Sequence, residues 1–246
     1  MPTHHETLRP IESLLAPLRA SAAPLLTWHG PSGERVELSG RVVDNWVAKS
    51  ANLLQEEYDA GPGTMVRLDM EPHWKSIALA LAAWHVGATV TTRPDGPADV
   101  VVTDSPEGAS GDEVLAVALP SLALSFGSDL PAGALDYASE VRSFGDVAFP
   151  EPVDAGATAL VTPDAELTFG ELVQEPTGTF GLAQDAGAVA FATDAQTGAV
   201  RNGISTVVHA AVVLFAAQRP LVVLGAGVEA SARLLEQERV AEMLGA

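Results

Sequence analysis

The sequence predicts an α/β protein with mostly parallel sheets flanked by helices. Two observations support this fold class. Short apolar runs of strand length alternate with longer runs of helical periodicity, and turns rich in Gly and Pro separate them. We expect two α/β lobes, residues 1–150 and 151–246, because the stretch 145–156 is rich in Gly, Pro and acidic residues.

The first elements are an amphipathic helix, a hairpin and a second helix. Apolar residues within 8–18 recur at helical spacing, and this helix is expected to stop near Pro24. The segment LLTWHGPSGERVEL, residues 25–38, is typical of two short strands around a Gly-Pro-Ser-Gly turn. Ser39 is expected to cap the next helix, whose apolar stripe covers residues 42–54.

The next segments alternate between strand and helix. AGPGTMVRLDM, residues 60–70, indicates a turn and a strand, and Pro72 is expected to open a helix that Gly87 ends. Strands are expected at 88–92 and 99–103, with a further candidate at 114–119. This order favours a parallel sheet with helices on its faces.

The last third of the chain repeats this alternation. ALVTPDAELTFGELV, residues 159–173, indicates strand, turn, strand and helix. A strand at 188–192 is followed by a polar loop, a helix at 204–217, a strand at 220–225 and a final helix predicted over 228–244. A strand, a loop containing Gly and a helix is the arrangement in which α/β proteins often hold phosphate.

Composition excludes several function classes. Asp and Glu outnumber Lys and Arg by 32 to 13, which gives a formal net charge of −19, so we expect no nucleic-acid partner and no membrane-surface partner. The chain has no cysteine, which excludes disulfides and Cys-ligated metals. The first ten residues lack the pattern of a secretory signal, and we expect an acidic, cytoplasmic protein.

Three stretches of the chain carry a family resemblance: residues 26–54, residues 60–104 and residues 215–240, the last of which ends in LLEQERV. In order, they resemble the N-terminal portion of the adenylate-forming (AMP-binding) superfamily, which includes acyl-CoA synthetases, adenylation domains of peptide synthetases and luciferases. The resemblance is strongest over Ala60–Asp104. It implies the fold of the N-terminal subdomains of acyl-CoA synthetases.

The resemblance also implies candidate site residues in the loop FATDAQTGAVRNG, residues 191–203. In the family, this loop is rich in Ser, Thr and Gly, and its backbone N–H groups bind the phosphates of ATP. Thr193, Thr197 and Gly198 match the Thr, Thr and Gly of that pattern, and Arg201 falls on its lysine. Thr206 matches a further threonine. These five residues are the candidate cofactor-binding residues, with ATP or AMP as the implied ligand.

The same loop departs from the family pattern, and we interpret it as degenerate. Asp194 and Ala195 stand where the family has Ser and Gly, and Val200 and Asn202 replace the Pro and Gly that flank the cation. Fewer glycines restrict the backbone angles that aim successive N–H groups at one anion. A carboxylate at about 4 Å from a phosphate oxygen repels it by several kcal/mol at intermediate screening. The alternative interpretation is an ordinary polar loop.

The resemblance further implies motifs for adenine, ribose and magnesium and a C-terminal lid with a catalytic lysine, and none of these is found in the sequence. Lys49 and Lys75 are the only lysines and lie in predicted helices far from the loop. We therefore expect no complete adenylating enzyme and assign no catalytic residue. An acid–CoA ligase-like activity would need a partner that supplies the lid.

Three functions remain open at this point. The first is a weak binder of a nucleotide or an acyl ligand. The second is a non-catalytic module that forms a homo-oligomer or binds a protein partner through apolar surface. The third is dinucleotide binding through Gly225-x-Gly227-x-x-Ala230, although no acidic strand follows and Glu229 is expected in the first turn of the helix.

The histidines and tryptophans favour core packing over chemistry. The six histidines do not cluster, His73 and His85 lie 12 positions apart on one predicted helix, and we predict no metal site. His209, on an apolar helix, is expected to pack in the core. The four tryptophans fall on apolar stripes or turns and are interpreted as core residues: Trp28, Trp46, Trp74 and Trp84.

Overall fold

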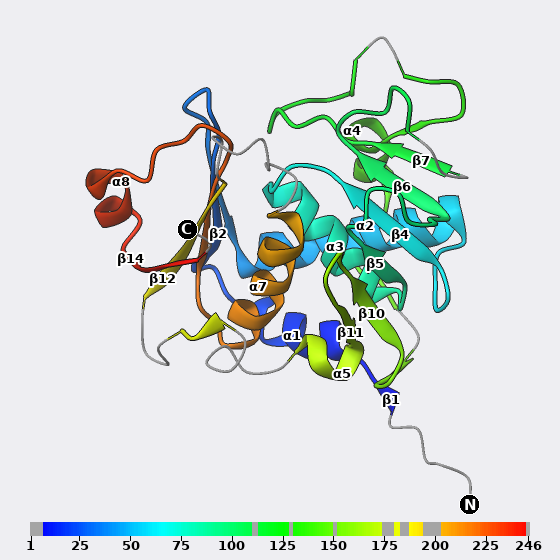
Figure 1. Cartoon of the computed structure of the whole chain (residues 1–246), viewed down its shortest axis with the longest axis horizontal. Coiled ribbons are helices and arrows are strands. Elements are labelled where there is room, and N and C mark those ends of the chain that lie inside the picture. Colours follow the sequence, from blue (N-terminus) through cyan, green and yellow to red (C-terminus); the bar gives the residue numbers. More distant parts are fainter. Residues whose placement is uncertain are drawn as a thin grey trace, which may run out of the picture.

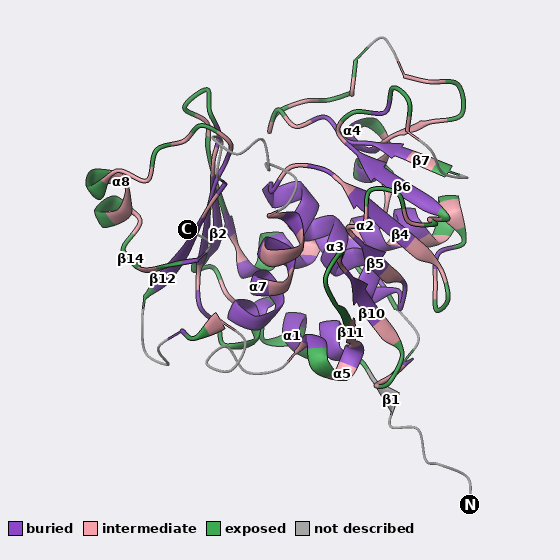
Figure 2. Cartoon of the chain, in the orientation of Figure 1, coloured by how far each residue is buried: buried purple, intermediate pink, exposed green. Residues whose placement is uncertain are grey.

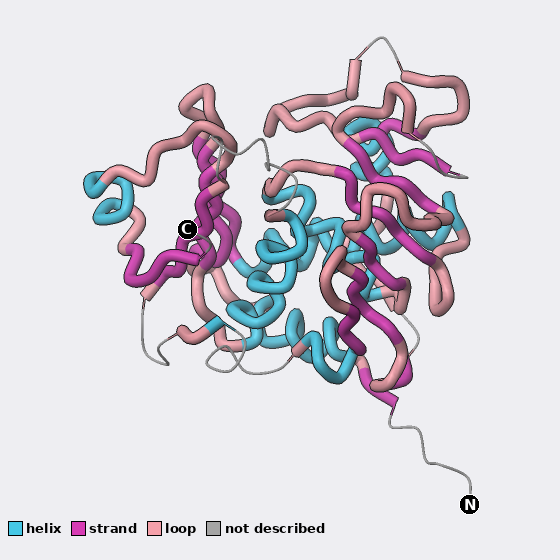
Figure 3. Tube along the Cα trace, in the orientation of Figure 1, coloured by secondary structure: helices cyan, strands magenta, loops and turns pink. Residues whose placement is uncertain are grey.

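A computed structural model describes residues 7–109, 113–127, 130–149, 152–173, 180–182, 187–193 and 203–244. Two large sheets stand on either side of a layer of helices (Figures 1 and 3). A small pair of strands, β1 (Thr7–Leu8) and β9 (Val153–Asp154), runs antiparallel beside them. The α/β fold with mostly parallel sheets is therefore confirmed.

The first large sheet has seven strands in the order β11-β10-β5-β4-β6-β7-β8. All neighbours in it are parallel except β10 and β11. Its strands are β4 (Met65–Asp69), β5 (Thr89–Thr91), β6 (Val100–Thr103), β7 (Glu113–Ala116), β8 (Leu135–Asp136), β10 (Thr158–Val161) and β11 (Glu166–Thr168). The central strands are buried on both faces, as parallel strands between helical layers must be.

The second large sheet has five strands in the order β14-β12-β13-β2-β3, and only β2 and β3 are antiparallel. Its strands are β2 (Pro24–His29), β3 (Arg35–Ser39), β12 (Ala188–Ala192), β13 (Leu221–Leu224) and β14 (Val240–Leu244). Both large sheets thus combine strands from before and after residue 150. The division into lobes at that residue stays a prediction.

The helical layer is the most deeply buried part of the molecule (Figure 2). Every residue of α3 (Trp74–His85) is buried, and α7 (Ile204–Ala216) packs beside it. The other helices are α1 (Pro10–Leu18), α2 (Gly40–Tyr58), α4 (Tyr137–Glu140), α5 (Phe169–Leu172), α8 (Ala232–Gln237) and the 3₁₀ helix η1 (Val141–Ser143). None of the described helices is long and apolar enough to cross a bilayer.

Two helix starts can be compared with the predictions. Ser39 caps α2 as expected, since its side chain accepts a hydrogen bond from the Val42 N–H. The helix expected to open at Pro72 begins instead at Trp74, because His73 is its N-cap. The His73 ring accepts from the Lys75 N–H, and Ser76 completes a capping box. The imidazole of His73 therefore has the N-cap role that a Ser or Asp side chain usually has.

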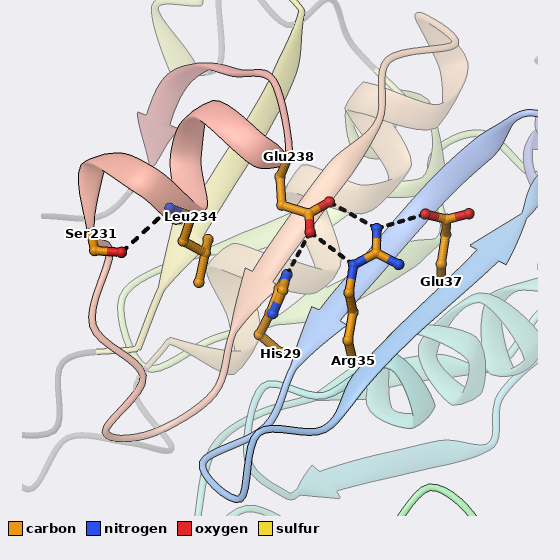
Figure 4. Close-up of polar contacts among 6 residues, drawn as sticks. All are labelled: His29, Arg35, Glu37, Ser231, Leu234 and Glu238. Atoms are coloured by element: carbon orange, nitrogen blue, oxygen red, sulfur yellow. Dashed lines mark hydrogen bonds and ion pairs between the residues drawn. The ribbon is translucent and has the colours of Figure 1, made fainter.

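The prediction of one helix over residues 228–244 is wrong. Only Ala232–Gln237 is helical, and Ser231 caps it by accepting from the Leu234 N–H (Figure 4). Arg239 then adopts a left-handed conformation at φ 53°, which ends the helix, and β14 follows. Residues of β14 alternate between half-buried and exposed before buried Leu244, and this period of two is that of a strand.

The tryptophans lie in the core, as predicted. Trp28, Trp74 and Trp84 are 5%, 3% and 1% exposed, and half-buried Trp46 packs against the same core. Trp46 and Trp74 contact at 5.1 Å between ring centroids, in an edge-on geometry. His209 is half-buried and packs edge-on against Phe180 at 5.4 Å.

Candidate functional site

The candidate site lies where the carboxyl ends of three parallel strands meet the start of α7. Ala192 of β12, Leu224 of β13 and His29 of β2 are aligned in register at this edge of the five-stranded sheet. In open α/β sheets, ligands bind outside such carboxyl ends. Of the five candidate residues, Thr193 and Thr206 belong to the described part of the chain. Thr197, Gly198 and Arg201 lie outside the described residues.

Thr193 connects two strands of the sheet. Its backbone N–H donates to the Leu224 carbonyl at 3.1 Å, and its hydroxyl donates to the same oxygen. The residue is 8% exposed. Because a hydroxyl has one proton, Thr193 has no O–H left to donate to a phosphate, and it can serve a ligand only as an acceptor or through its position.

Two features of the described start of α7 favour an anion. Its N-cap is Gly203, which forms no side-chain cap, and its first turn contains no acidic residue. Thr206 lies in that first turn and is half-buried. A first turn that has no acidic residue and no cap from its own N-cap side chain, at the positive end of the helix dipole, favours an anion.

Gly203 is required at this position by close packing. A Cβ atom added there would lie 2.6 Å from Cζ of Phe191 in β12 and 3.7 Å from Cγ of Pro72, just before α3. The missing side chain therefore lets the starts of α7 and α3 approach the end of β12. It also leaves no side chain to compete with a ligand for the first turn of α7.

His73 places a neutral donor beside this edge. Its Nδ1 accepts from the Lys75 N–H at 3.1 Å, so Nε2 carries the proton of the neutral ring. Burial lowers the pKa of His73 to about 3, with a smaller contribution from the Lys75 charge, which keeps the ring neutral at physiological pH. Nε2 is buried and has no hydrogen-bond partner among the described residues.

Trp28 supplies a second donor of the same kind. Its ring packs edge-on against His73 at 4.2 Å between centroids, and its indole N–H is also buried without a partner in the described structure. That nitrogen would lie 3.5 Å from a Cβ atom added to Gly225, at the end of β13. The sequence predicts only a helix position for His73 and a core position for Trp28. It does not indicate their contact, because that contact depends on how the sheet packs against α3.

Both lysine ammonium groups donate to backbone carbonyls away from the start of α7, in agreement with their distance in sequence from the loop. Lys49 donates to the Phe144 carbonyl. Lys75 is 3% exposed and donates to the Ala118 and Pro120 carbonyls, with its ammonium 5.4 Å from the centre of the Trp74 ring. Neither ammonium is available to a phosphate at the start of α7.

The Gly225–Ala230 segment does not have the geometry of a dinucleotide site. Gly225 and Gly227 form a tight turn in which the Val228 N–H donates to the Gly225 carbonyl. The helix that should open at this turn begins only at Ala232 and has six residues. The expectation that Glu229 lies in its first turn is wrong, because the helix that follows this turn begins three residues beyond Glu229.

No group of three His, Asp or Glu side chains in the described part of the chain could hold a metal ion. His73 and His85 lie at opposite ends of α3, about 18 Å apart at 1.5 Å per residue.

Comparison with solved structures assigns the fold. The chain superimposes on an acyl-CoA synthetase of Brucella canis with a TM-score of 0.74 and 14% identity, covering 96% of this chain and 47% of that one. A mutant form of coronafacic acid ligase from Pectobacterium brasiliense gives 0.71 and 11%, covering 96% and 50%. Acetoacetyl-CoA synthetase from Streptomyces lividans gives 0.67 and 16%, covering 89% and 38%. The fold is that of the N-terminal portion of acyl-CoA synthetases, as the sequence resemblance implied.

Sequence comparison adds one curated relative. A "TIGR03089 family protein" of Mycobacterium tuberculosis is 39% identical over 154 residues, which are 56% of this chain and 63% of the relative. No family model matches the sequence. The chain thus spans less than two thirds of this relative and about half the length of the first two synthetases.

Proposed function

We propose that this acyl-CoA-synthetase-like chain binds a phosphate-bearing ligand, ATP, AMP or an acyl adenylate, at the start of α7 and does not adenylate an acid on its own. The observation that supports this is the composition of the start of α7. A helix of 13 residues begins at an uncapped glycine, has no acid in its first turn and follows the carboxyl end of a parallel strand.

The proposed binding is weak because the chain offers little positive charge near this edge. Both lysines donate to backbone carbonyls elsewhere, and the net charge of −19 opposes the approach of an anion. Arg201 is the cation that the family resemblance implies for the loop, and Asp194 in the same sequence segment opposes it. The neutral N–H groups of α7 therefore contribute most of the attraction.

Catalysis of adenylation requires more positive charge at the phosphates than binding does. Charge builds on the transferring phosphates in the transition state, and cations or metal ions must stabilise it. A ligase-type activity would thus need a partner that brings the missing cations. We expect the purified chain to show no ATP–pyrophosphate exchange.

The test is titration calorimetry with ATP, AMP and adenosine. Saturable binding of ATP and AMP with none of adenosine supports phosphate recognition. Equal binding of adenosine, or no heat from any of the three at millimolar concentration, contradicts it. Turnover by the chain alone would contradict the non-catalytic part of the proposal.

A matched pair of variants locates the binding. Thr206→Asp places a carboxylate at the third position of α7, where it stabilises the helix but repels phosphate. Val42→Asp adds the same charge at the third position of α2, which also lacks an acid in its first turn. We expect about ten-fold weaker ATP binding, or more, for Thr206→Asp and no change for Val42→Asp. Equal weakening by both would show that binding lies elsewhere.

Self-association is the second candidate function. β14 is an edge strand of the five-stranded sheet, and its Met243 is 38% exposed. An edge with exposed apolar side chains can pair with a second copy of the chain, whereas a lysine on such a strand blocks pairing. Light scattering that gives a dimer mass, reduced to one chain by Met243→Lys, would support this. A single-chain mass for the unchanged protein would exclude it.

A further inference from the structure

A cavity of about 510 Å³ lies at the C-terminal end of α3, away from the start of α7. Side chains of α1, α2 and the segment 146–149 wall it together with His85. The volume falls in the range of about 300–1,000 Å³ that small-molecule sites occupy. His85 and the N-cap His73 are at opposite ends of α3, so this cavity is distinct from the candidate phosphate site.

The charged part of the wall has an excess of carboxylates. Arg19 donates from its two terminal nitrogens to Glu12 at 2.8 and 2.6 Å and from Nε to both oxygens of Asp44 at 3.1 Å. One guanidinium therefore serves two carboxylates. Asp146 adds a third negative charge to the wall and exposed Arg9 a second positive one. Among the described wall residues, two cations against three anions leave one negative charge in excess.

His85 adds a buried acceptor that lacks a donor. The residue is 5% exposed, and Nδ1 has no hydrogen-bond partner in the described structure. Burial lowers the pKa of His85, which keeps the ring neutral, and its hydrogen bond with the Ala148 backbone opposes this shift. In the tautomer that carries its proton on Nε2, Nδ1 is a lone pair without a donor, and a buried acceptor left in this way costs about 1–3 kcal/mol.

The remaining wall is apolar and partly open to solvent. Phe149 is 86% exposed and Val147 is 58% exposed, whereas Leu15 and Ala48 beneath them are buried. Large apolar side chains left exposed beside a charged cavity indicate a surface that a ligand can cover. The cavity thus combines hydrogen-bond acceptors, a net negative charge and an aromatic side chain.

We propose that this cavity binds a small primary amine with an apolar or aromatic body. The ammonium group donates to Nδ1 of His85 and to the carboxylates of Glu12 and Asp44, and the body of the ligand packs on Phe149. A carboxylate ligand of the same shape meets three negative charges and is rejected. A neutral alcohol supplies a single donor and leaves the negative charge uncompensated, so it binds less tightly.

Three probes of one shape test the ligand class by calorimetry: 2-phenylethylamine, 2-phenylethanol and 3-phenylpropionate. We expect saturable binding of the amine, binding of the alcohol weaker by about ten-fold or more, and none of the acid. Absence of amine binding at millimolar concentration, or equal binding of amine and acid, would overturn the proposal.

Two pairs of variants test the place of binding. His85→Leu removes the unpaired acceptor, and we expect about ten-fold weaker amine binding. The control is His209→Leu, because Nε2 of His209 is also buried without a partner but lies on α7. Phe149→Ala removes an exposed ring and leaves the core intact. We expect it to weaken amine binding by about five-fold, whereas Leu122→Ala, which removes an 89% exposed leucine elsewhere, has no effect.

The outcomes separate cleanly. Unchanged amine affinity in Phe149→Ala, a variant that has no reason to misfold, would place the amine outside this cavity. Equal losses in His85→Leu and His209→Leu would indicate a general effect on the fold. Because none of the three probes contains phosphate, and because His85→Leu and Phe149→Ala lie outside α7, failure here leaves the proposed nucleotide site untouched, and the reverse also holds.

Discussion

Replacing Glu238 with alanine tests how α8 is held to the rest of the protein. α8 has no buried residue. Glu238, at its C-terminal cap, accepts from Nε and Nη2 of Arg35 at 2.8 and 3.0 Å and lies 3.0 Å from Nε2 of His29 (Figure 4). Its side chain is 6% exposed. This carboxylate therefore joins α8 to the β2–β3 hairpin across more than 200 positions of sequence.

The magnitude follows from the exposure of the two partners. Hydrogen bonds to charged groups contribute about 1.5–3 kcal/mol, whereas exposed ion pairs contribute about 0–1 kcal/mol. Glu238 is nearly buried and Arg35 is 38% exposed, so we expect a loss of about 2 kcal/mol from the free energy of opening α8. At 1.36 kcal/mol per factor of ten, this raises the population of the opened state about 30-fold, and amide exchange that follows this population accelerates by the same factor.

Native-state hydrogen exchange measures this opening at two amides. The Leu235 N–H donates to the Ser231 carbonyl and the Glu238 N–H to the Leu234 carbonyl, and both bonds are within α8 or its caps. Glu37→Ala is the control, because Glu37 also bonds Arg35 but is 41% exposed and lies on the same strand as Arg35. Unchanged exchange in Glu238→Ala, or equal acceleration in both variants, would refute the reasoning.

The same network has a defined pH dependence. The hydrogen bonds from Arg35 hold the pKa of Glu238 below its ordinary value. A carboxylate with a lowered pKa in the folded state contributes stability that is complete above its unfolded pKa of about 4.3. That contribution is lost as the pH falls through the lowered value. The difference in α8 protection between the unchanged protein and Glu238→Ala should therefore shrink as the pH falls below about 4.3.

Three further predictions concern the buried positions around α3 and α7. Gly203→Ala places a Cβ atom 2.6 Å from the Phe191 ring. We expect a loss of about 2 kcal/mol in the free energy of unfolding, which lowers the Tm by about 4–8 °C. Gly61→Ala is the control and should leave the Tm unchanged, because the nearest atom to its Cβ lies at 3.9 Å. Burial lowers the pKa of Lys75 to about 8, so the free energy of unfolding should rise from pH 8 to about 10 in the unchanged protein but less in Lys75→Met. The unchanged protein should lose about 2 kcal/mol of its free energy of unfolding between neutral pH and pH 5, because the folded His73 ring has a pKa of about 3 and stays neutral. His73→Asn keeps an N-cap side chain but has no such ring, so it should not show this loss.

Melting curves and urea titrations check these three predictions. The sign for Lys75 follows because the unfolded chain keeps its proton up to about pH 10.4 while the folded chain loses it near 8. For His73, the unfolded ring gains a proton below about pH 6.5 while the folded ring stays neutral. Equal melting of the two glycine variants, or parallel pH profiles in Lys75→Met or His73→Asn and the unchanged protein, would contradict the corresponding prediction.

Local periodicity was sufficient for most of the fold and failed where a distant partner decides the conformation. The stretch after Gly225 has helical spacing, yet residues 240–244 form a strand because β12 offers a parallel edge. The two-residue strands β1 and β9 are too short to leave any pattern. Ser39 was predictable as a cap because its partner, Val42, is three residues away.

Of the site residues that the sequence predicts, only Thr193 and Thr206 lie in the described part of the chain. Thr193 matches a family threonine, but its hydroxyl bonds to Leu224 because of the register between β12 and β13, which no local pattern reports. The contact between Trp28 and His73 and the cavity at His85 each join segments far apart in sequence. A buried histidine without a partner becomes visible only once the packing is known.

The two proposed sites should respond to salt in opposite directions. At the start of α7, the attraction comes mainly from neutral N–H groups, while the net charge of −19 repels the phosphates over long range. Salt screens that repulsion more than it weakens the short contacts, so ATP affinity should rise between about 0.02 and 0.15 M sodium chloride, as the Debye length falls to about 8 Å. In the His85 cavity, carboxylates and the net charge both attract the ammonium, so 2-phenylethylamine should bind less tightly over the same range. Calorimetry on one sample measures both. If both affinities move in the same direction, the assignment of neutral donors to one site and charged acceptors to the other is wrong.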